Sequence, residues 1–199
     1  MKGVAILILS FLFFSCEDSP EGKPIPPKKN GHYLGGYLYE VNTIEYLYSS
    51  NDFHYISLKG ETVDKGNLFD KYAKLCGDTT YASFQESTIA LSDTIYSIHV
   101  TCNSDFDADH KKDEYLDDII SLQFLSFYEF IKANYDDIQN NIREKDITQI
   151  NSETLTLIEP TLGVRFLKTP TDKGKYEFTL SITSGNDKTH TIPLHVDFK

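Results

Sequence analysis

The sequence predicts a mainly β fold, a β-sandwich, with one or two short helices. Apolar and polar residues alternate over residues 176–182 and again over 192–198, which is the period of a half-buried strand. The turn sequence SGND at residues 184–187 lies between these runs and predicts a β-hairpin. Other short apolar runs are separated by turn residues at intervals of about ten residues, as in sandwiches. An α+β fold is the alternative.

Residues 1–15 are predicted to be a signal peptide. Lys2 gives a positive start, and residues 4–14 are almost entirely apolar, a run much shorter than the ~20 residues of a membrane-spanning helix. The sequence LFFSC at residues 12–16 resembles the lipobox of bacterial lipoproteins, which implies cleavage before Cys16 and acylation of its thiol. Because the two phenylalanines of this segment are bulkier than the residues usual there, an ordinary secretory signal cleaved elsewhere is the alternative.

Residues 16–31 are predicted to be a flexible tether, because the segment is rich in proline and has almost nothing to bury. The acidic pair Glu17-Asp18 resembles export signals of Bacteroidota lipoproteins displayed at the cell surface. An outer-membrane lipid anchor is therefore expected, facing either the cell surface or the periplasm. Residues 32–199 have the length of a single domain, and a sub-boundary near residues 145–152 is the alternative organisation.

The composition indicates a folded, acidic protein. The chain is 40% hydrophobic and carries 30 acidic against 19 basic residues, a net charge of −11 that becomes one unit more negative if Lys2 is removed. This charge repels phosphate backbones and anionic lipid headgroups. We therefore expect no nucleic-acid partner, a membrane contact made through the lipid, and a protein or glycan as the remaining class of partner.

Further elements are expected between the tether and the C-terminal hairpin. A helix is predicted up to Cys76, because apolar residues recur on one helical face, Asn67 can cap its start and Gly77 suits the position after its end. A second helix is predicted over residues 127–142 from the same kind of periodicity, although three asparagines lower its propensity. The predicted strands cover residues 37–48, 53–58, 96–102, 154–158 and 164–168.

The stretch from Gly174 to Lys199 resembles the last two strands of bacterial immunoglobulin-like domains, which implies an immunoglobulin-like C-terminal part of the sandwich. Residues 154–158 and 164–168 are predicted to be earlier strands of the same unit. Pro193 removes a backbone donor from the last strand, so that strand is expected at a sheet edge.

Cys76 and Cys102 both fall on apolar faces, in a chain expected in a compartment that permits disulfides. A bridge between them would close a loop of about 25 residues and contribute on the order of 3 kcal/mol. Two buried free thiols are the alternative. Neither cysteine has a neighbouring Cys-x-x-Cys partner or a feature that would lower a thiol pKa, so neither is predicted to be catalytic.

Alternating carboxylates in the run NSDFDADH, at residues 103–110, suggest a calcium loop. Ala108 stands where such a loop needs glycine, and Lys111 stands where it needs a ligand or water, so a solvated acidic loop is the alternative. Calcium is the one cofactor that the sequence suggests. The candidate ligands, at positions one, three, five, seven and twelve, are Asn103, Asp105, Asp107, Asp109 and Glu114.

Tyrosines crowd the first folded segment, and Tyr33, Tyr37 and Tyr39 are candidate ligand-facing aromatics, because tyrosine rings stack on sugars or partner proteins. The alternative is core packing, since tyrosine is common in strands and the chain has no tryptophan.

The sequence contains no His-Glu-x-x-His, Gly-x-Ser-x-Gly, P-loop or Gly-x-Gly-x-x-Gly motif, so no enzyme is predicted. The run from Ile98 to Asp118 resembles uncharacterised lipoproteins of gut Bacteroidota, which implies a location and no activity. The expected function is a non-enzymatic binding or structural lipoprotein. A carbohydrate-binding or weakly marked glycoside-active protein is the first alternative, and a calcium-dependent adhesion module is the second.

Overall fold

The structure is a computed structural model that describes residues 31–79, 88–135, 142–152, 155–185 and 187–199. No helix within these ranges has both the length and the apolar character needed to cross a membrane. The elements in chain order are β1 (Gly36–Ser50), β2 (Phe53–Val63), α1 (Gly66–Cys76), β3 (Ile89–Leu91), β4 (Ile95–Cys102), the 3-10 helix η1 (Asp117–Ile119), β5 (Ile120–Ser126), α2 (Tyr128–Lys132), β6 (Ile142–Asp146), α3 (Ile147–Ile150), β7 (Ile158–Phe166), β8 (Gly174–Ser184) and β9 (Lys188–Phe198).

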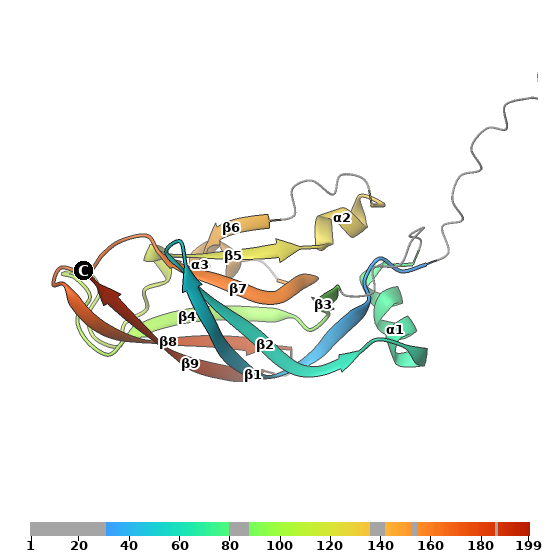
Figure 1. Ribbon diagram of the computed structural model, residues 1–199, viewed down its shortest axis with the longest axis horizontal. Coiled ribbons are helices and arrows are strands. Elements are labelled where there is room, and N and C mark those ends of the chain that lie inside the picture. Colours follow the sequence, from blue (N-terminus) through green and yellow to red (C-terminus); the bar gives the residue numbers. More distant parts are fainter. Residues whose placement is uncertain (1–30, 80–87, 136–141, 153–154, 186) are drawn as a thin grey trace, which may run out of the picture.

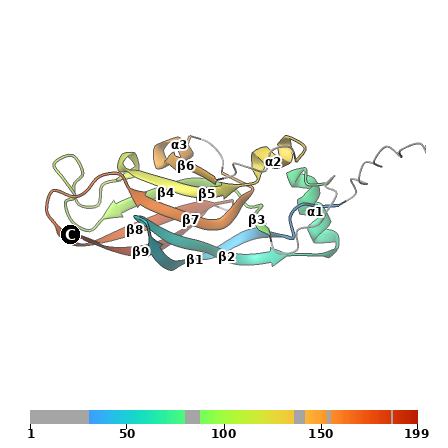
Figure 2. The same cartoon turned by 45° about the horizontal axis from the view of Figure 1, so that its top comes forward.

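The described strands form two sheets that pack face to face, so the predicted mainly β fold is confirmed (Figure 1). The larger sheet has the order β2-β1-β3-β7-β5-β6, and the smaller sheet has the order β4-β8-β9. Helices α1 and α2 lie at one end of the sandwich (Figures 1 and 2). The turn between β1 and β2 and the end of β9 lie toward the other end of the sandwich (Figure 1).

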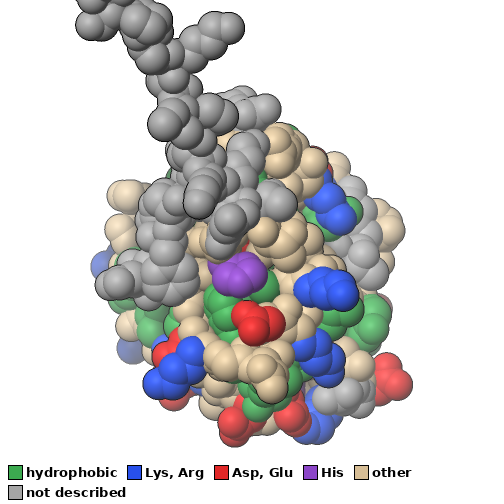
Figure 3. Space-filling model, turned by 90° about the vertical axis from the view of Figure 1, so that its right-hand side faces the viewer, with side chains coloured by type: hydrophobic (Ala, Val, Ile, Leu, Met, Phe, Trp, Pro, Cys, Tyr) green, Lys and Arg blue, Asp and Glu red, His purple; other side chains and the backbone are tan. Residues whose placement is uncertain are grey.

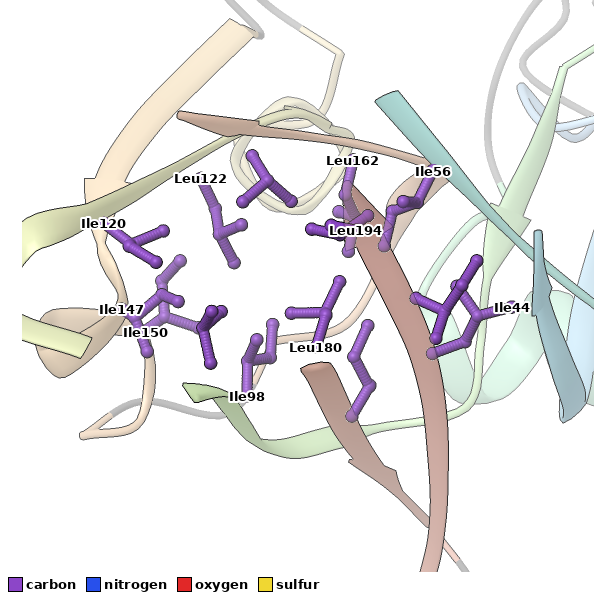
Figure 4. Packing of buried hydrophobic residues seen from close by; sticks show 14 of the residues in the cluster. Ile44, Ile56, Ile98, Ile120, Leu122, Ile147, Ile150, Leu162, Leu180 and Leu194 are labelled. Carbon is purple, nitrogen blue, oxygen red and sulfur yellow. The ribbon is translucent and has the colours of Figure 1, made fainter. Parts of the chain in front are cut away.

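Aliphatic side chains from both sheets fill the space between them (Figure 4). Burial of each such side chain contributes about 1.5–3 kcal/mol. Helix α3, at the sub-boundary considered near residues 145–152, adds Ile147 and Ile150 to the same core. The labelled core residues of the two sheets are Ile44, Ile56, Ile120, Leu122 and Leu162 of the larger sheet and Ile98, Leu180 and Leu194 of the smaller one.

The β1–β2 hairpin is long and strongly twisted. The hairpin joins the rest of the sheet through a different strand at each end. At the open end of the hairpin β1 pairs with β3, and near its turn β2 pairs with β7. Three register shifts in the β1–β2 ladder permit this twist. Gly60 lies at one shift, where the strands approach so closely that a Cβ atom would lie 1.8 Å from the carbonyl oxygen of Glu40.

The C-terminal hairpin is confirmed, because β8 and β9 pair antiparallel along their whole length. Strand β9 is an edge strand and Pro193 is exposed on it, as expected. Residues 164–166 belong to β7, which lies in the larger sheet between β5 and β2 and faces the C-terminal hairpin across the common core. Of the predicted strand over residues 154–158, Leu155 forms a single bridge to Ile95 and β7 begins only at Ile158; residue 154 is outside the described residues.

Helix α1 matches its prediction at the C-terminal end, where Gly77 has a left-handed backbone with φ of 79°. At the other end Lys65 takes the N-cap position in place of Asn67, and it makes no capping side-chain hydrogen bond. Of the second predicted helix, α2 covers residues 128–132, residues 133–135 are not helical, and residues 136–141 lie outside the described residues. The backbone turns left-handed at Asn134 and Tyr135, with φ of 58° and 64°, which ends helical geometry, and the chain continues as a strand from residue 142.

Candidate functional site

Tyr37 is fully buried and does not face a ligand, so that prediction is wrong. Its hydroxyl donates a hydrogen bond to the carboxylate of Asp78 at 3.1 Å. Burial and, next, the negative charge of Asp78 hold the pKa of Tyr37 well above its usual value of 10. Successive residues of β1 point to opposite faces, so Tyr37 packs with Phe69 and Ala73 of α1 whereas Leu38 packs in the core between the sheets.

Asp78 follows the left-handed cap of α1 and is completely buried. Its carboxylate also accepts hydrogen bonds from the backbone amides of Tyr33 and Leu34, at 2.8 and 2.9 Å, and from the hydroxyl of Tyr135 at 2.8 Å. With Tyr37 this gives four donors around one carboxylate. Asp78 therefore joins the first described residues to α1 and to the segment after α2, and its role is structural.

Tyr33 and Tyr39 are half-buried, and their rings pack against other rings of the protein. Tyr33 meets Phe130 edge to face with centroids 4.8 Å apart, and Tyr39 stacks on Tyr72 with centroids 5.3 Å apart. The core-packing alternative therefore describes these two tyrosines, as it does Tyr37.

Cys76 and Cys102 are both free thiols, and the predicted bridge between them is absent. Cys76 packs against the hydrophobic cluster around α1, whereas Cys102 is buried in the core between the sheets. The two lie at opposite ends of the sandwich, because β4 runs away from α1 before it reaches Cys102 (Figure 1). Burial and then the charge of Asp78 raise the pKa of Cys76 to about 11. Cys16 lies outside the described residues.

The five predicted calcium ligands do not converge. The Asp105 carboxylate accepts the backbone amide of Lys112 at 2.9 Å, and Asp107 accepts the amides of Asp109 and His110 at 2.8 Å each. These bonds turn the carboxylates toward their own loop. Within the described residues no group of three or more histidine, cysteine, aspartate and glutamate side chains could hold a metal ion.

The acidic loop is fixed by three histidine–aspartate contacts. His110 is buried between Asp107 and Asp118, with ring nitrogen to carboxylate distances of 2.8 and 3.0 Å. Burial alone would lower the pKa of His110, but the hydrogen bonds and charges of the two aspartates outweigh it and raise the pKa. His99 of β4 contacts Asp117 at 2.7 Å. These contacts hold the loop against the smaller sheet.

A groove of about 980 Å³ opens at the end of the sandwich opposite α1. Three segments form its walls, namely the β1–β2 turn with the strand ends beside it (residues 49–54), the end of β7 with the residues after it (165–169) and the end of β9 with the residue after it (195–199). Tyr46 stands at the rim and is 44% exposed. The volume lies at the upper end of the range of small-molecule sites.

Two buried nitrogen atoms in the groove wall lack hydrogen-bond partners among the described residues. They are Nδ1 of His54 and Nε of Arg165. The Arg165 guanidinium lies 5.0 Å from the ring centroid of Phe53, and its Nη2 pairs with Glu144. The His54 ring meets Phe166 edge to face at 6.2 Å, and burial lowers the pKa of His54, so the ring is neutral at pH 7. Unpaired buried polar atoms cost about 1–3 kcal/mol each, and these two atoms are themselves closed to the groove.

The groove was not predicted from the sequence, because its walls come from segments far apart in the chain. The one local signal is the run SSND at residues 49–52, where Asn51 and Asp52 have left-handed φ values of 50° and 66°, as in tight hairpin turns. That run predicts a turn but not what lies opposite it. Comparison of the chain with protein-family models, with curated proteins and with solved structures finds no match, so the geometry of the groove is the basis for a proposed function.

Proposed function

We propose that this chain is an exported, lipid-anchored binding protein that holds its ligand in the groove at the end of the sandwich opposite α1. The observation that carries the proposal is the groove itself, whose volume of about 980 Å³ and mixed polar and aromatic lining suit a small ligand.

The position of the groove supports display away from a membrane. The described chain begins at Gly31, at the end that carries α1, whereas the groove opens at the far end of the long axis (Figures 1 and 2). A tether that leads from Cys16 to Gly31 would therefore leave the groove facing outward. At the α1 end, basic and acidic side chains are interspersed around exposed apolar ones (Figure 3).

The polar groups of the groove favour binding over catalysis. Among the residues that line it, all of which are described, no histidine is hydrogen-bonded to a serine, a threonine or a carboxylate. Among the described residues, the one ion pair made by a lining residue joins Arg165 to Glu144, and both side chains are partly exposed. Nucleophilic and general acid–base sites are usually recognised by such paired groups.

The anchor is tested by mass spectrometry of the mature N-terminus and by membrane fractionation of a Cys16→Ala variant. We expect an acylated Cys16 in the parent protein and loss of membrane association in the variant. If the mature N-terminus is unmodified and lies at another residue, the lipid anchor is refuted, and the proposal that the groove binds a ligand is unaffected.

The groove is tested with a thermal-shift screen of glycans, peptides and small metabolites. A hit should be lost in Thr169→Trp, which fills the groove from an exposed loop position, and kept in Thr191→Trp, which places the same ring on an exposed position of β9 outside the groove. If Thr169→Trp retains every ligand found, or if no class of ligand shifts the melting temperature, the groove is not a binding site.

A further inference from the structure

We infer that the ligand of the groove is an extended peptide segment of another protein, which pairs as an added strand with the free edge of β9. The inference rests on the proposed function and names its ligand class. Three observations lead to it: the direction of the backbone groups of β9, the place where its edge is open, and the balanced charge of the lining.

The backbone groups of alternate residues in β9 point away from β8. The amide of Asn103 donates to the carbonyl oxygen of Glu177 at 3.1 Å, so Glu177 directs its backbone groups toward β4. Its neighbour Phe178 therefore directs its own groups toward β9, where it pairs with Leu194. The N–H and C=O groups of His195, which follows Leu194, consequently point out of the sheet.

The row of free donors and acceptors is limited to the end of β9. Next to His195 on the same side of the strand are Asp197, toward the C-terminus, and Pro193, toward the turn with β8. Pro193 has no N–H, so it interrupts the row. At the start of β9, Lys188 is paired with Glu40 of β1 at 2.6 Å, and that part of the strand lies against β1. Among the described residues, no other segment makes a backbone hydrogen bond to the outer side of β9.

The open part of the edge coincides with the groove. Residues 195–199 form one wall, and at about 3.3 Å per residue a strand laid along them would extend for ~17 Å. Residues 49–54 form another wall, so the added strand would lie between β9 and the β1–β2 turn. Hydrogen bonds between the main chains would supply affinity, and alternate side chains of the peptide would reach the other walls and supply specificity.

The lining does not favour a charged ligand. It carries two lysines and two aspartates, and its remaining cation, Arg165, is paired with Glu144. Recognition by net charge is therefore weak. A peptide backbone presents neutral N–H and C=O groups, and a strand repeats them at the same two-residue spacing as the free edge of β9.

The inference is tested with random dodecapeptides displayed on phage, selected on the full chain and counter-selected on Thr169→Trp. We expect peptides that bind the parent and that this variant excludes. Each selected peptide is then synthesised with one backbone amide methylated at a time. Methylation should weaken binding about tenfold or more at alternate residues and less than about twofold at the residues between, because only alternate amides face β9. An even response along the peptide would overturn the inference.

Substitutions in β9 separate backbone pairing from side-chain contact. His195→Pro removes an outward N–H and leaves the ladder with β8 intact, as Pro193 already does, and it should weaken binding about tenfold or more. His195→Ala keeps this N–H and should change binding less than about twofold. Thr191→Pro, the same substitution at an exposed outward position on the other side of Pro193, is the matched control and should leave binding unchanged.

The results also separate this inference from the proposed function. If a selected peptide binds His195→Pro as tightly as the parent, or if His195→Ala weakens binding as much as His195→Pro, the peptide does not pair with this edge and the inference falls. If His195→Pro does not fold, the methylation pattern decides. If no peptide is selected while the screen finds another ligand that Thr169→Trp excludes, the inference is overturned and the binding groove stands. If no ligand of any class is excluded by Thr169→Trp, both proposals fall.

Discussion

Removal of the Asp78 carboxylate should destabilise the protein strongly. Asp78→Ala takes the acceptor away from two buried donors, the amide of Leu34 and the hydroxyl of Tyr37, and from two partly buried ones. An unpaired buried donor costs about 1–3 kcal/mol, so we expect a loss of about 2–6 kcal/mol in the free energy of unfolding. Typical domains have about 5–15 kcal/mol in total.

Urea denaturation followed by circular dichroism measures this loss. Asp64→Ala, an exposed acid just before α1, is the control and should change the free energy of unfolding by less than about 0.5 kcal/mol. Tyr37→Phe should cost about 1 kcal/mol alone and less in the Asp78→Ala background, because the hydroxyl has then already lost its acceptor. A loss below about 1 kcal/mol for Asp78→Ala, or full additivity of the two substitutions, would refute the hydrogen-bond account.

Three further predictions concern the hairpin, the acidic loop and the thiols. Gly60→Ala should lower the free energy of unfolding, measured by urea denaturation, by more than about 2 kcal/mol, because the new Cβ would lie 1.8 Å from the Glu40 carbonyl oxygen. An unchanged free energy of unfolding would contradict the close approach of the two strands. Because the pKa of His110 is raised above 6.5 in the folded state, its protonation stabilises the protein below pH 6.5, and this contribution is lost as pH rises through the raised pKa. The melting temperature of the parent should therefore fall, relative to that of His110→Asn, between pH 6 and pH 8; parallel curves would argue against the two aspartate contacts. Alkylation in denaturant without reductant should modify both Cys76 and Cys102. In the native protein the thiol of Cys76, with a pKa of about 11, should react slowly at pH 8. If the mass of the denatured, alkylated protein shows that both cysteines are unmodified, the two are joined by a disulfide and the free-thiol assignment is wrong.

Local sequence patterns predicted those strands, turns and helix ends that are determined by residues close together in the chain. The C-terminal hairpin follows from alternation on both sides of a turn, and α1 ends at Gly77 because glycine adopts the left-handed conformation readily. The extension of α2 to residue 142 was predicted from apolar spacing, and it failed because two residues, Asn134 and Tyr135, take left-handed backbone angles that no periodicity reveals.

Features that depend on distant pairing could not be predicted. The pattern of β7 predicts a strand but not that its neighbours are β2 and β5. Asp78 carries no sequence signal of burial, because its four donors come from residues 33–37 and 135. His54 and Arg165 likewise meet only when β2 pairs with β7, and this pairing creates the groove.

The order in which strands join the two sheets has a consequence for how the chain acquires its structure. The larger sheet combines residues 36–63 with residues 120–166, and the smaller one combines residues 95–102 with residues 174–198. The larger sheet cannot close before residue 166 is present and the smaller one not before residue 198, and such non-local pairing makes folding slow. A chain that emerges gradually through an export channel would thus remain unfolded until its last strands arrive, and truncation before β8 should leave a species exposed to proteases.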